Sequence, residues 1–261
     1  MNRIKVWVNG ALGKMGRTTC DAIRALDDMT LAAAVDTAFA EDAARDAFGI
    51  EGVPLYATLA ECIKQEQLDV AVDFTTPSAV FNNIISCLGA DIHCVVGTTG
   101  ITDQQLASIE SEVRSTGRNC FLAPNFAIGA VLMMEVSKVI ARYMPYCEII
   151  ELHHDQKLDA PSGTSLRTAE LIEAARVESP EPAGPEGHAA RGVIHKGIPI
   201  HSVRLPGLVA HQEVVFGGQG QTLSIRHDSI SRESFMPGVV LAVRHVADLE
   251  EGLIVGLEKI M

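Results

Sequence analysis

The sequence has little positive charge. Lysine and arginine total 21 residues against 33 aspartates and glutamates, which leaves a formal net charge of -12 at pH 7. A protein that binds nucleic acid or an anionic membrane presents a basic face, and the sequence shows none. We therefore expect neither partner. An anionic ligand would need positive charge that is concentrated locally.

Cysteine pairs and long apolar runs are missing as well. The chain has six cysteines but no Cys-x-x-Cys pair, so the spacing predicts neither a zinc site nor a disulfide framework. No apolar run approaches the ~18 residues of a membrane helix, and the N-terminal residues enter a strand pattern without the apolar region of a secretory signal. We expect a cytoplasmic protein with reduced, mostly buried thiols, no membrane segment and no metal.

The first half of the chain alternates strands with helices. Helical patterns separate its five apolar strand candidates, which lie at residues 3–10, 31–36, 69–77, 93–100 and 120–126. Continuous apolar strands of this kind predict a parallel sheet that is covered on both faces. We predict a Rossmann-type, doubly wound α/β domain over residues 1–126.

The pattern changes after residue 126. Two helices with a strand between them precede a Pro- and Gly-rich stretch at residues 177–192, which predicts a loop. Three strand candidates then follow without intervening helices. This order predicts an α+β substrate domain with an open mixed sheet over residues 127–233. Residues 234–261, a helix and an apolar tail, are expected to complete the first domain.

A glycine-rich turn follows the first strand. Gly10, Gly13 and Gly16 form a G-x-x-G-x-x-G variant of the dinucleotide fingerprint. Glycines allow a tight turn and let the backbone approach a pyrophosphate at a helix N-terminus. Asp36 ends the second strand, where a carboxylate accepts hydrogen bonds from ribose hydroxyls. The combination predicts a dinucleotide site, and the GTTG and APNF stretches at later strand ends predict its nicotinamide half.

The stretch ELHHDQKLDAPSGTS, residues 151–165, predicts the reacting end. His153, His154 and Lys157 precede Ser162-Gly163-Thr164, which opens a helix. An ammonium beside a helix N-terminus indicates a carboxylate or phosphate site. Because phosphate sites more often recruit arginines, the pattern favours a carboxylate substrate, with the amides of Ser162 to Thr164 expected to bind it.

In this order, GALGKMG, DFTTP, GTTG, APNF and ELHHDQKLDAPSGT resemble the 4-hydroxy-tetrahydrodipicolinate reductase family, also called dihydrodipicolinate reductases. The resemblance covers nearly the whole chain. It implies NAD(P)H-dependent reduction of 4-hydroxy-tetrahydrodipicolinate, a small dicarboxylate, to tetrahydrodipicolinate in lysine and diaminopimelate biosynthesis. It also implies a homotetramer that is built through the substrate-domain sheets.

The same resemblance implies a role for each matching residue. His153 and Lys157 would form the acid/base pair. The substrate would be held by His154, Ser162, Gly163 and Thr164. The dinucleotide would be lined by Gly10, Ala11, Leu12, Gly13, Lys14, Met15, Asp36, Gly97, Thr98, Thr99, Ala123, Pro124, Asn125 and Phe126.

One position bears on the choice of cofactor. Family members that use NADPH readily often carry a basic residue directly after the ribose-binding acid, and here that residue is Thr37. Lys14 and Arg17 lie in the glycine loop and the helix after it, from which they could reach a 2′-phosphate. We expect NADH to be favoured and NADPH to be accepted.

Three other functions share part of these features. A related dehydrogenase for another imino or keto acid, such as an aspartate dehydrogenase, shares the first domain and differs in the His-His-x-x-Lys run. A hydrolase that binds a metal through His153, His154 and Asp155 requires adjacent strand histidines, which is poor ligand geometry. A non-enzymatic dinucleotide sensor would not need the cluster around Lys157.

Overall fold

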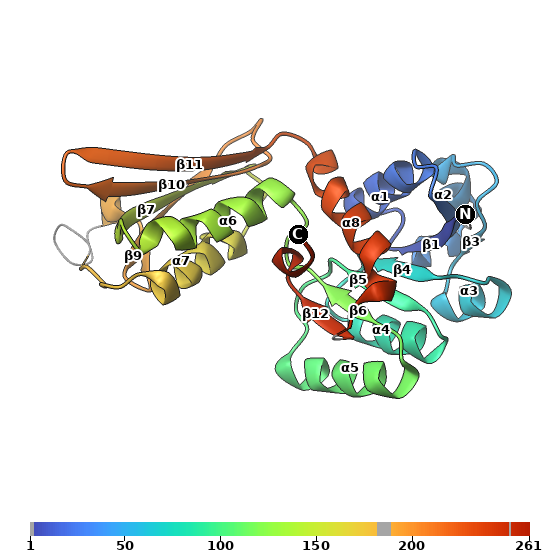
Figure 1. The fold of residues 1–261 in the computed structure, drawn as a ribbon. Helices are drawn as coiled ribbons and strands as arrows, with labels where there is room; N and C mark the ends of the chain where they lie inside the picture. The colour runs from blue at the N-terminus through green and yellow to red at the C-terminus, as the bar shows by residue number, and fades with distance from the viewer. Residues whose placement is uncertain (1–2, 182–188, 251) are drawn as a thin grey trace. The chain divides into compact units, whose positions relative to one another are not determined.

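The computed structural model describes residues 3–181, 189–250 and 252–261 (Figure 1). The chain divides into two compact units, unit 1 (Met1–Phe126 and Phe235–Met261) and unit 2 (Ala127–Ser234). The centre of the loop expected at residues 177–192 lies outside the described residues.

Unit 1 is built on a parallel sheet whose described strands number seven, in the order β12-β6-β5-β4-β1-β2-β3. The strands are β1 (Ile4–Asn9), β2 (Met29–Val35), β3 (Leu55–Tyr56), β4 (Val70–Asp73), β5 (His93–Val96), β6 (Cys120–Leu122) and β12 (Leu253–Val255). Every neighbouring pair is parallel. The doubly wound α/β fold expected from the sequence is confirmed.

Helices surround this sheet. They are α1 (Lys14–Arg24), α2 (Asp42–Phe48), α3 (Leu59–Gln65), α4 (Val80–Gly89), α5 (Asp103–Thr116) and α8 (Met236–His245). Local sequence fixes several of their ends. Thr102 and Gln105 form a capping box at the start of α5, and Gly117 ends that helix in the left-handed conformation that glycine tolerates.

The direction of strand order in unit 1 reverses between β1 and β4. Asn9 and Asp73, the last residues of these two strands, are register partners. In open parallel sheets, ligands bind outside the carboxyl ends of the strands at such a reversal. The topology therefore places a binding edge where the glycine loop begins.

Unit 2 contains a five-stranded sheet in the order β11-β10-β7-β9-β8. Its strands are β7 (Tyr146–His153), β8 (Val193–His195), β9 (Ile198–Arg204), β10 (Ala210–Gly218) and β11 (Gln221–Ser229). The β7–β9 pair is parallel and the other pairs are antiparallel. The open mixed sheet expected from the sequence is confirmed.

Helices α6 (Ile128–Ala141) and α7 (Gly163–Ala175) lie together along one face of this sheet (Figure 1). Alternate strand residues, among them Ile149, Val214 and Phe216, point toward the helices and form the buried core. We call the other side the open face, and it carries Glu148, Ile150, Leu152 and Val215. The alternation predicted for β11 is present, although Leu223 remains 43% exposed.

Three general features complete the fold. Within the described ranges, no helix is both long and apolar enough to cross a membrane. The same ranges hold no group of three or more His, Cys, Asp or Glu side chains arranged to bind a metal ion. All six cysteines are free thiols, and all except Cys147 are buried.

Candidate active site

The glycine loop of unit 1 leaves no room for side chains at two positions. Gly10 has φ +74°, and a Cβ there would lie 2.6 Å from the carbonyl oxygen of Phe74. A Cβ on Gly16 would lie 2.0 Å from the carbonyl oxygen of Gly10. The loop is therefore packed backbone against backbone. Gly13 is the N-cap of α1 and provides no side-chain cap, which leaves the helix N-terminus suited to an anion.

Asp36 ties this loop to the end of β2. Its Oδ2 accepts a hydrogen bond from the Leu12 amide at 3.0 Å, and its Oδ1 accepts one from the Ala38 amide at 3.1 Å. A carboxylate offers about four acceptor positions, so two remain for ligand hydroxyls. Asp36 also lines a cavity of about 520 Å³ together with Asn9, Gly10, Gly13, Val35, Thr37, Ala57, Thr58, Leu59, Phe74, Thr75, Thr76, Ala79 and Asn83.

Asp73 is a residue of this edge that sequence reasoning missed. Its side chain is buried and accepts hydrogen bonds from five donors, on Asn9, Thr75, Asn83 and Thr98, at 2.7–3.3 Å. It thereby links the end of β1 to Thr98, which follows β5. The buried Asn9 Oδ1 has no hydrogen-bond partner in the described structure. The DFTTP motif contained the signal, because an aspartate that ends a buried strand needs donors.

The other residues expected to bind the dinucleotide follow the same sheet edge. Gly97, Thr98 and Thr99 come directly after β5, and the stretch from Ala123 to Phe126 comes after β6. Phe126 is buried and packs edge-on against Phe74, with ring centroids 6.0 Å apart. Ala11 is buried within the loop, whereas Lys14 and Met15 form the first turn of α1.

In unit 2, the predicted acid His153 is the last residue of β7. Its Nδ1 is hydrogen-bonded to Glu151 Oε2. Because a carboxylate only accepts hydrogen bonds, Nδ1 carries the proton in this pair. Glu151 lies two residues earlier on the same strand, so both side chains point to the same face. No role for Glu151 was predicted from the sequence.

Glu151 is fully buried, and besides His153 its hydrogen-bond donors include Arg204, the Ser162 amide and the Ser202 side chain. Arg204 of β9 donates to both carboxylate oxygens, at 2.8 and 2.9 Å, and the Ser162 amide donates to Oε1 at 3.3 Å. Burial raises the pKa of Glu151, but hydrogen bonds from His153 and Arg204 outweigh it and lower the pKa to about 2. The carboxylate is therefore charged at neutral pH.

Lys157 and Asp159 lie in the loop between β7 and α7. Lys157 Nζ donates to both carboxylate oxygens of Asp159, at 2.7 and 2.8 Å, and the Lys157 amide donates to the carbonyl of His154. The hydrogen bond from Lys157 Nζ holds the pKa of Asp159 below its usual range. Asp159 thus orients the predicted acid/base lysine, and Arg204 in turn binds the Asp159 carbonyl at 2.7 Å.

The turn that opens α7 differs from the expectation in one respect. Ser162 was expected to offer its amide to the substrate, yet that amide is bonded to Glu151. The Ser162 side chain is the N-cap of α7 and accepts from the Ser165 amide at 3.2 Å. Gly163 is exposed, and a Cβ there would contact nothing within 4 Å. The space at the helix start therefore lies beside Gly163 rather than at Ser162.

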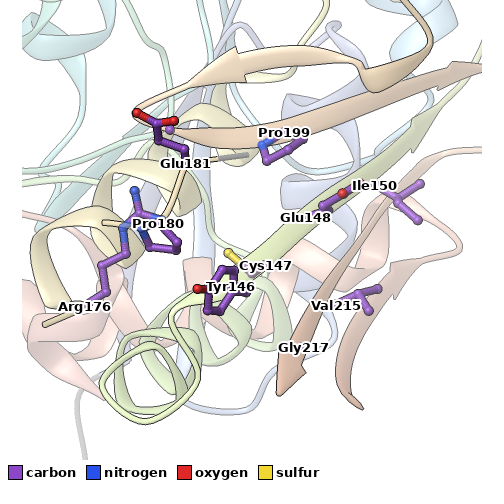
Figure 2. Close-up of a pocket in the computed structure, with 11 residues that line it drawn as sticks. Tyr146, Cys147, Glu148, Ile150, Arg176, Pro180, Glu181, Pro199, Val215 and Gly217 are labelled. Carbon is purple, nitrogen blue, oxygen red and sulfur yellow. The ribbon is translucent and has the colours of Figure 1, made fainter. Parts of the chain in front are cut away.

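A second cavity lies elsewhere in unit 2. It has a volume of about 430 Å³ and is lined by residues of β7, β9 and β10 together with Arg176, Pro180, Glu181 and Gly197 (Figure 2). None of the residues predicted to bind substrate or cofactor lines it. Glu148, Ile150 and Val215 contribute to it from the open face of the sheet.

Comparison with known proteins agrees with these motifs. Two family models match the chain, described as dihydrodipicolinate reductase, N-terminus, over residues 4–126, and dihydrodipicolinate reductase, C-terminus, over residues 129–261. Together they cover nearly all of its length. This chain belongs to the dihydrodipicolinate reductase family. It is an oxidoreductase, and the resemblance drawn from the sequence motifs is confirmed.

Individual relatives extend over the whole chain. The 4-hydroxy-tetrahydrodipicolinate reductases of Halalkalibacterium halodurans and Syntrophomonas wolfei are each 46% identical to it, with 99% of both chains covered. A solved structure described as dipicolinate-bound dihydrodipicolinate reductase from Paenisporosarcina sp. TG-14 is 42% identical, with a TM-score of 0.88 over 99% of this chain and 100% of that one. A probable dehydrogenase from Thermotoga maritima shares the fold at 13% identity, with a TM-score of 0.66 over 98% of this chain and 92% of that one.

Proposed function

We propose that this reductase converts 4-hydroxy-tetrahydrodipicolinate to tetrahydrodipicolinate with NADH or NADPH, in lysine and diaminopimelate biosynthesis. The observation that carries the proposal is the cluster at the end of β7, where His153, Lys157 and the start of α7 are joined through Glu151, Arg204 and Asp159. The relatives that match the full chain carry this activity in their names.

The residues of unit 1 fit a dinucleotide. The glycine loop excludes side chains, Asp36 keeps acceptor positions beside a cavity of about 520 Å³, and the buried Asn9 Oδ1 lacks a partner. We assign the pyrophosphate to the residues from Gly10 to Met15 and the adenosine ribose to Asp36. Gly97 to Thr99 and Ala123 to Phe126 would hold the nicotinamide half, which supplies hydride when it is bound.

The residues of unit 2 fit a dicarboxylate imine. His154, Gly163 and Thr164 would hold the substrate, with Ser162 shaping the helix start through its side-chain cap. Elimination removes the substrate hydroxyl together with a proton from the adjacent ring carbon as water, and the double bond that forms is conjugated with the imine. Hydride then adds at the carbon that carried the hydroxyl, and the enamine that results is protonated at the adjacent carbon. One hydride and one proton are consumed for each water released. His153 Nε2 and Lys157 Nζ are the groups we assign to proton transfer.

Three finer assignments accompany this activity. We propose that NADH is preferred to NADPH, because Thr37 provides no counter-charge beside Asp36. We propose a homotetramer built through the open faces of the unit 2 sheets. We also propose a cytoplasmic location, where the reduced nicotinamide pool and a diffusible substrate are both present.

The test is an assay of NADH oxidation with freshly prepared 4-hydroxy-tetrahydrodipicolinate. We expect turnover, and we expect pyridine-2,6-dicarboxylate to compete with the substrate because it is a planar dicarboxylate of the same size. A panel of imino and keto acids that includes iminoaspartate separates the aspartate dehydrogenase alternative. Oxidation of NADH with iminoaspartate, and none with the hydroxylated ring, would refute the proposal.

A further inference from the structure

We infer that Glu151 is the positioning residue of this site, which fixes the orientation of His153 and the start of α7 at the same time. The inference deepens the proposed function and rests on it. It stands on one geometric fact, namely that a single fully buried carboxylate contacts both His153 Nδ1 and the Ser162 amide.

The strand register explains how one side chain reaches both groups. Ile149, Glu151 and His153 alternate along β7 and point to the face that α6 and α7 cover, where Ile149 enters the core. Glu151 therefore occupies a position on β7 that faces the core, next to the start of α7. Its Oε2 accepts the hydrogen bond from His153 Nδ1, and its Oε1 accepts the hydrogen bond from the Ser162 amide.

A buried charge at this position is not explained by stability. Replacing a buried ion pair by apolar residues of similar volume is often neutral or stabilising, because both charges lose their hydration. Glu151 nevertheless remains charged, because Arg204 on the neighbouring strand β9 donates a hydrogen bond to each of its carboxylate oxygens. Orientation of a reacting group is a role that an apolar pair could not serve.

The consequence for the reaction lies in the imidazole. Because the Nδ1 proton is held by Glu151, Nε2 is the nitrogen that remains for the substrate, and the ring cannot rotate without breaking the contact. The charged groups around His153 are Glu151 on β7, Arg204 on β9, and Lys157 with Asp159 in the following loop. Of these groups, Glu151 is the one that the described structure shows hydrogen-bonded to the ring.

The experiment compares Glu151→Gln and Glu151→Asp with wild type and with Glu173→Gln. Glu173 is a matched control, because it forms a carboxylate–arginine pair with Arg176 at the far end of α7. We expect Glu151→Gln to lower kcat by about tenfold to a hundredfold, as for other groups that orient a functional histidine. Glu151→Asp should fall between it and wild type, and Glu173→Gln should match wild type.

The tautomer of His153 separates positioning from structural damage. Because Glu151 accepts the Nδ1 proton, 15N NMR of histidine-labelled protein should show the Nδ1–H tautomer of His153 in wild type and a mixture of tautomers in Glu151→Gln. NADH affinity should not change in either variant. A loss of packing alone would lower the melting temperature and kcat together and would leave the tautomer unchanged.

Arg204 is left unpaired in Glu151→Gln, which can prevent folding. The double variant Glu151→Gln with Arg204→Met removes both charges and answers the same question. A folded variant of either kind with wild-type kcat and an unchanged His153 tautomer overturns the inference, as does failure of both to fold, because Glu151 is then a structural residue. Failure of the proposed function is distinct, since wild type itself would not reduce the substrate.

Discussion

At the scale of single residues, His153 and Lys157 are the two side chains of unit 2 that we assign to proton transfer. We expect His153→Ala and Lys157→Ala each to lower kcat by ~10² or more, which is the usual contribution of a positioned acid. NADH affinity should stay the same, because the glycine loop and Asp36 belong to the other unit. Steady-state kinetics and a fluorescence titration with NADH measure the two quantities.

A binding residue should behave differently from these two. Thr164→Ala is the comparison, and we expect it to raise KM for the substrate more than it lowers kcat. If His153→Ala or Lys157→Ala retains nearly normal turnover, that side chain is not the acid.

We expect the residues beside Asp36 to set the preference between NADH and NADPH. The Asp36 carboxylate would face the 2′-phosphate of NADPH, and at ~4–6 Å the screened repulsion is worth about 1–2 kcal/mol, roughly a tenfold to thirtyfold preference for NADH. Thr37 is exposed and uncharged, whereas Arg17 lies over the Phe48 ring at 4.9 Å and 4.0 Å from Asp21. Because Arg17 already contacts Phe48 and Asp21, we expect the exposed Lys14 to offset more of the repulsion than Arg17 does.

Two substitutions test this reading through kcat/KM for both cofactors. Asp36→Ala should narrow the preference by weakening NADH, and Thr37→Arg should narrow it by strengthening NADPH. A wild-type enzyme that prefers NADPH tenfold would show that Lys14 and Arg17 outweigh Asp36, and the assignment of that strand end would be wrong.

At the scale of elements, strands with a continuous apolar pattern were predictable and very short ones were not. Strands β3 and β12 contain two and three residues, too few for any periodicity to be visible. They exist because neighbouring strands β2 and β6 offer unpaired edges. Helix α2 was missed for another reason: its sequence, DAARDAF, buries only Phe48 and shows no apolar repeat.

The candidate site shows the same division between local and distant information. His153, Lys157 and Ser162 lie within ten residues of one another and form a readable motif. Arg204 is 53 positions from Glu151, and only the parallel pairing of β7 with β9 brings them together. Long-range pairs of this kind depend on register, which a single sequence does not specify.

The β5–β6 pair carries a pH-dependent contact. His93 is buried, and its Nδ1 accepts from the Asn119 amide at 3.0 Å, so that nitrogen is unprotonated in the fold. Burial, followed by the charge of Arg118, lowers the pKa of His93. Below pH 6.5, the ordinary pKa of histidine, His93 therefore binds a proton in the unfolded chain but stays neutral in the folded chain. The contribution of His93 to the free energy of unfolding is fully present above this pH and is lost as the pH drops toward the pKa of His93 in the folded chain.

We expect the urea midpoint of unfolding to fall between pH 7.5 and pH 5, and His93→Asn to reduce that fall. Asparagine keeps an acceptor near the Nδ1 position and does not titrate. Some pH dependence should persist, because burial also lowers the pKa of His227. The exposed His245→Asn is the control and should keep the full fall. An identical fall in His93→Asn and wild type would contradict the assignment.

At the scale of the whole molecule, the unit 2 sheet is covered on one side only. Its open face carries Ile150, Leu152 and Val215, all half-buried, and no described helix of unit 2 packs on them. An open sheet with an apolar stripe requires a cover. A second copy of the same sheet would provide one, because twofold symmetry brings identical stripes together.

Pairing of two open faces gives a dimer, and the family resemblance implies that the full particle has four chains. Light scattering coupled to size-exclusion chromatography should give four times the 27.9 kDa chain mass at micromolar concentration. Val215→Asp places an unpaired charge on the open face and should shift the mass to smaller species. Leu132→Asp is the matched control, because Leu132 is exposed on α6, on the helical side of the unit. A monomeric wild-type chain, or equal masses for the two variants, would exclude the open face as the contact. In that case the edge of β11 would be the next candidate contact, because its unpaired backbone groups can pair with a strand of another chain.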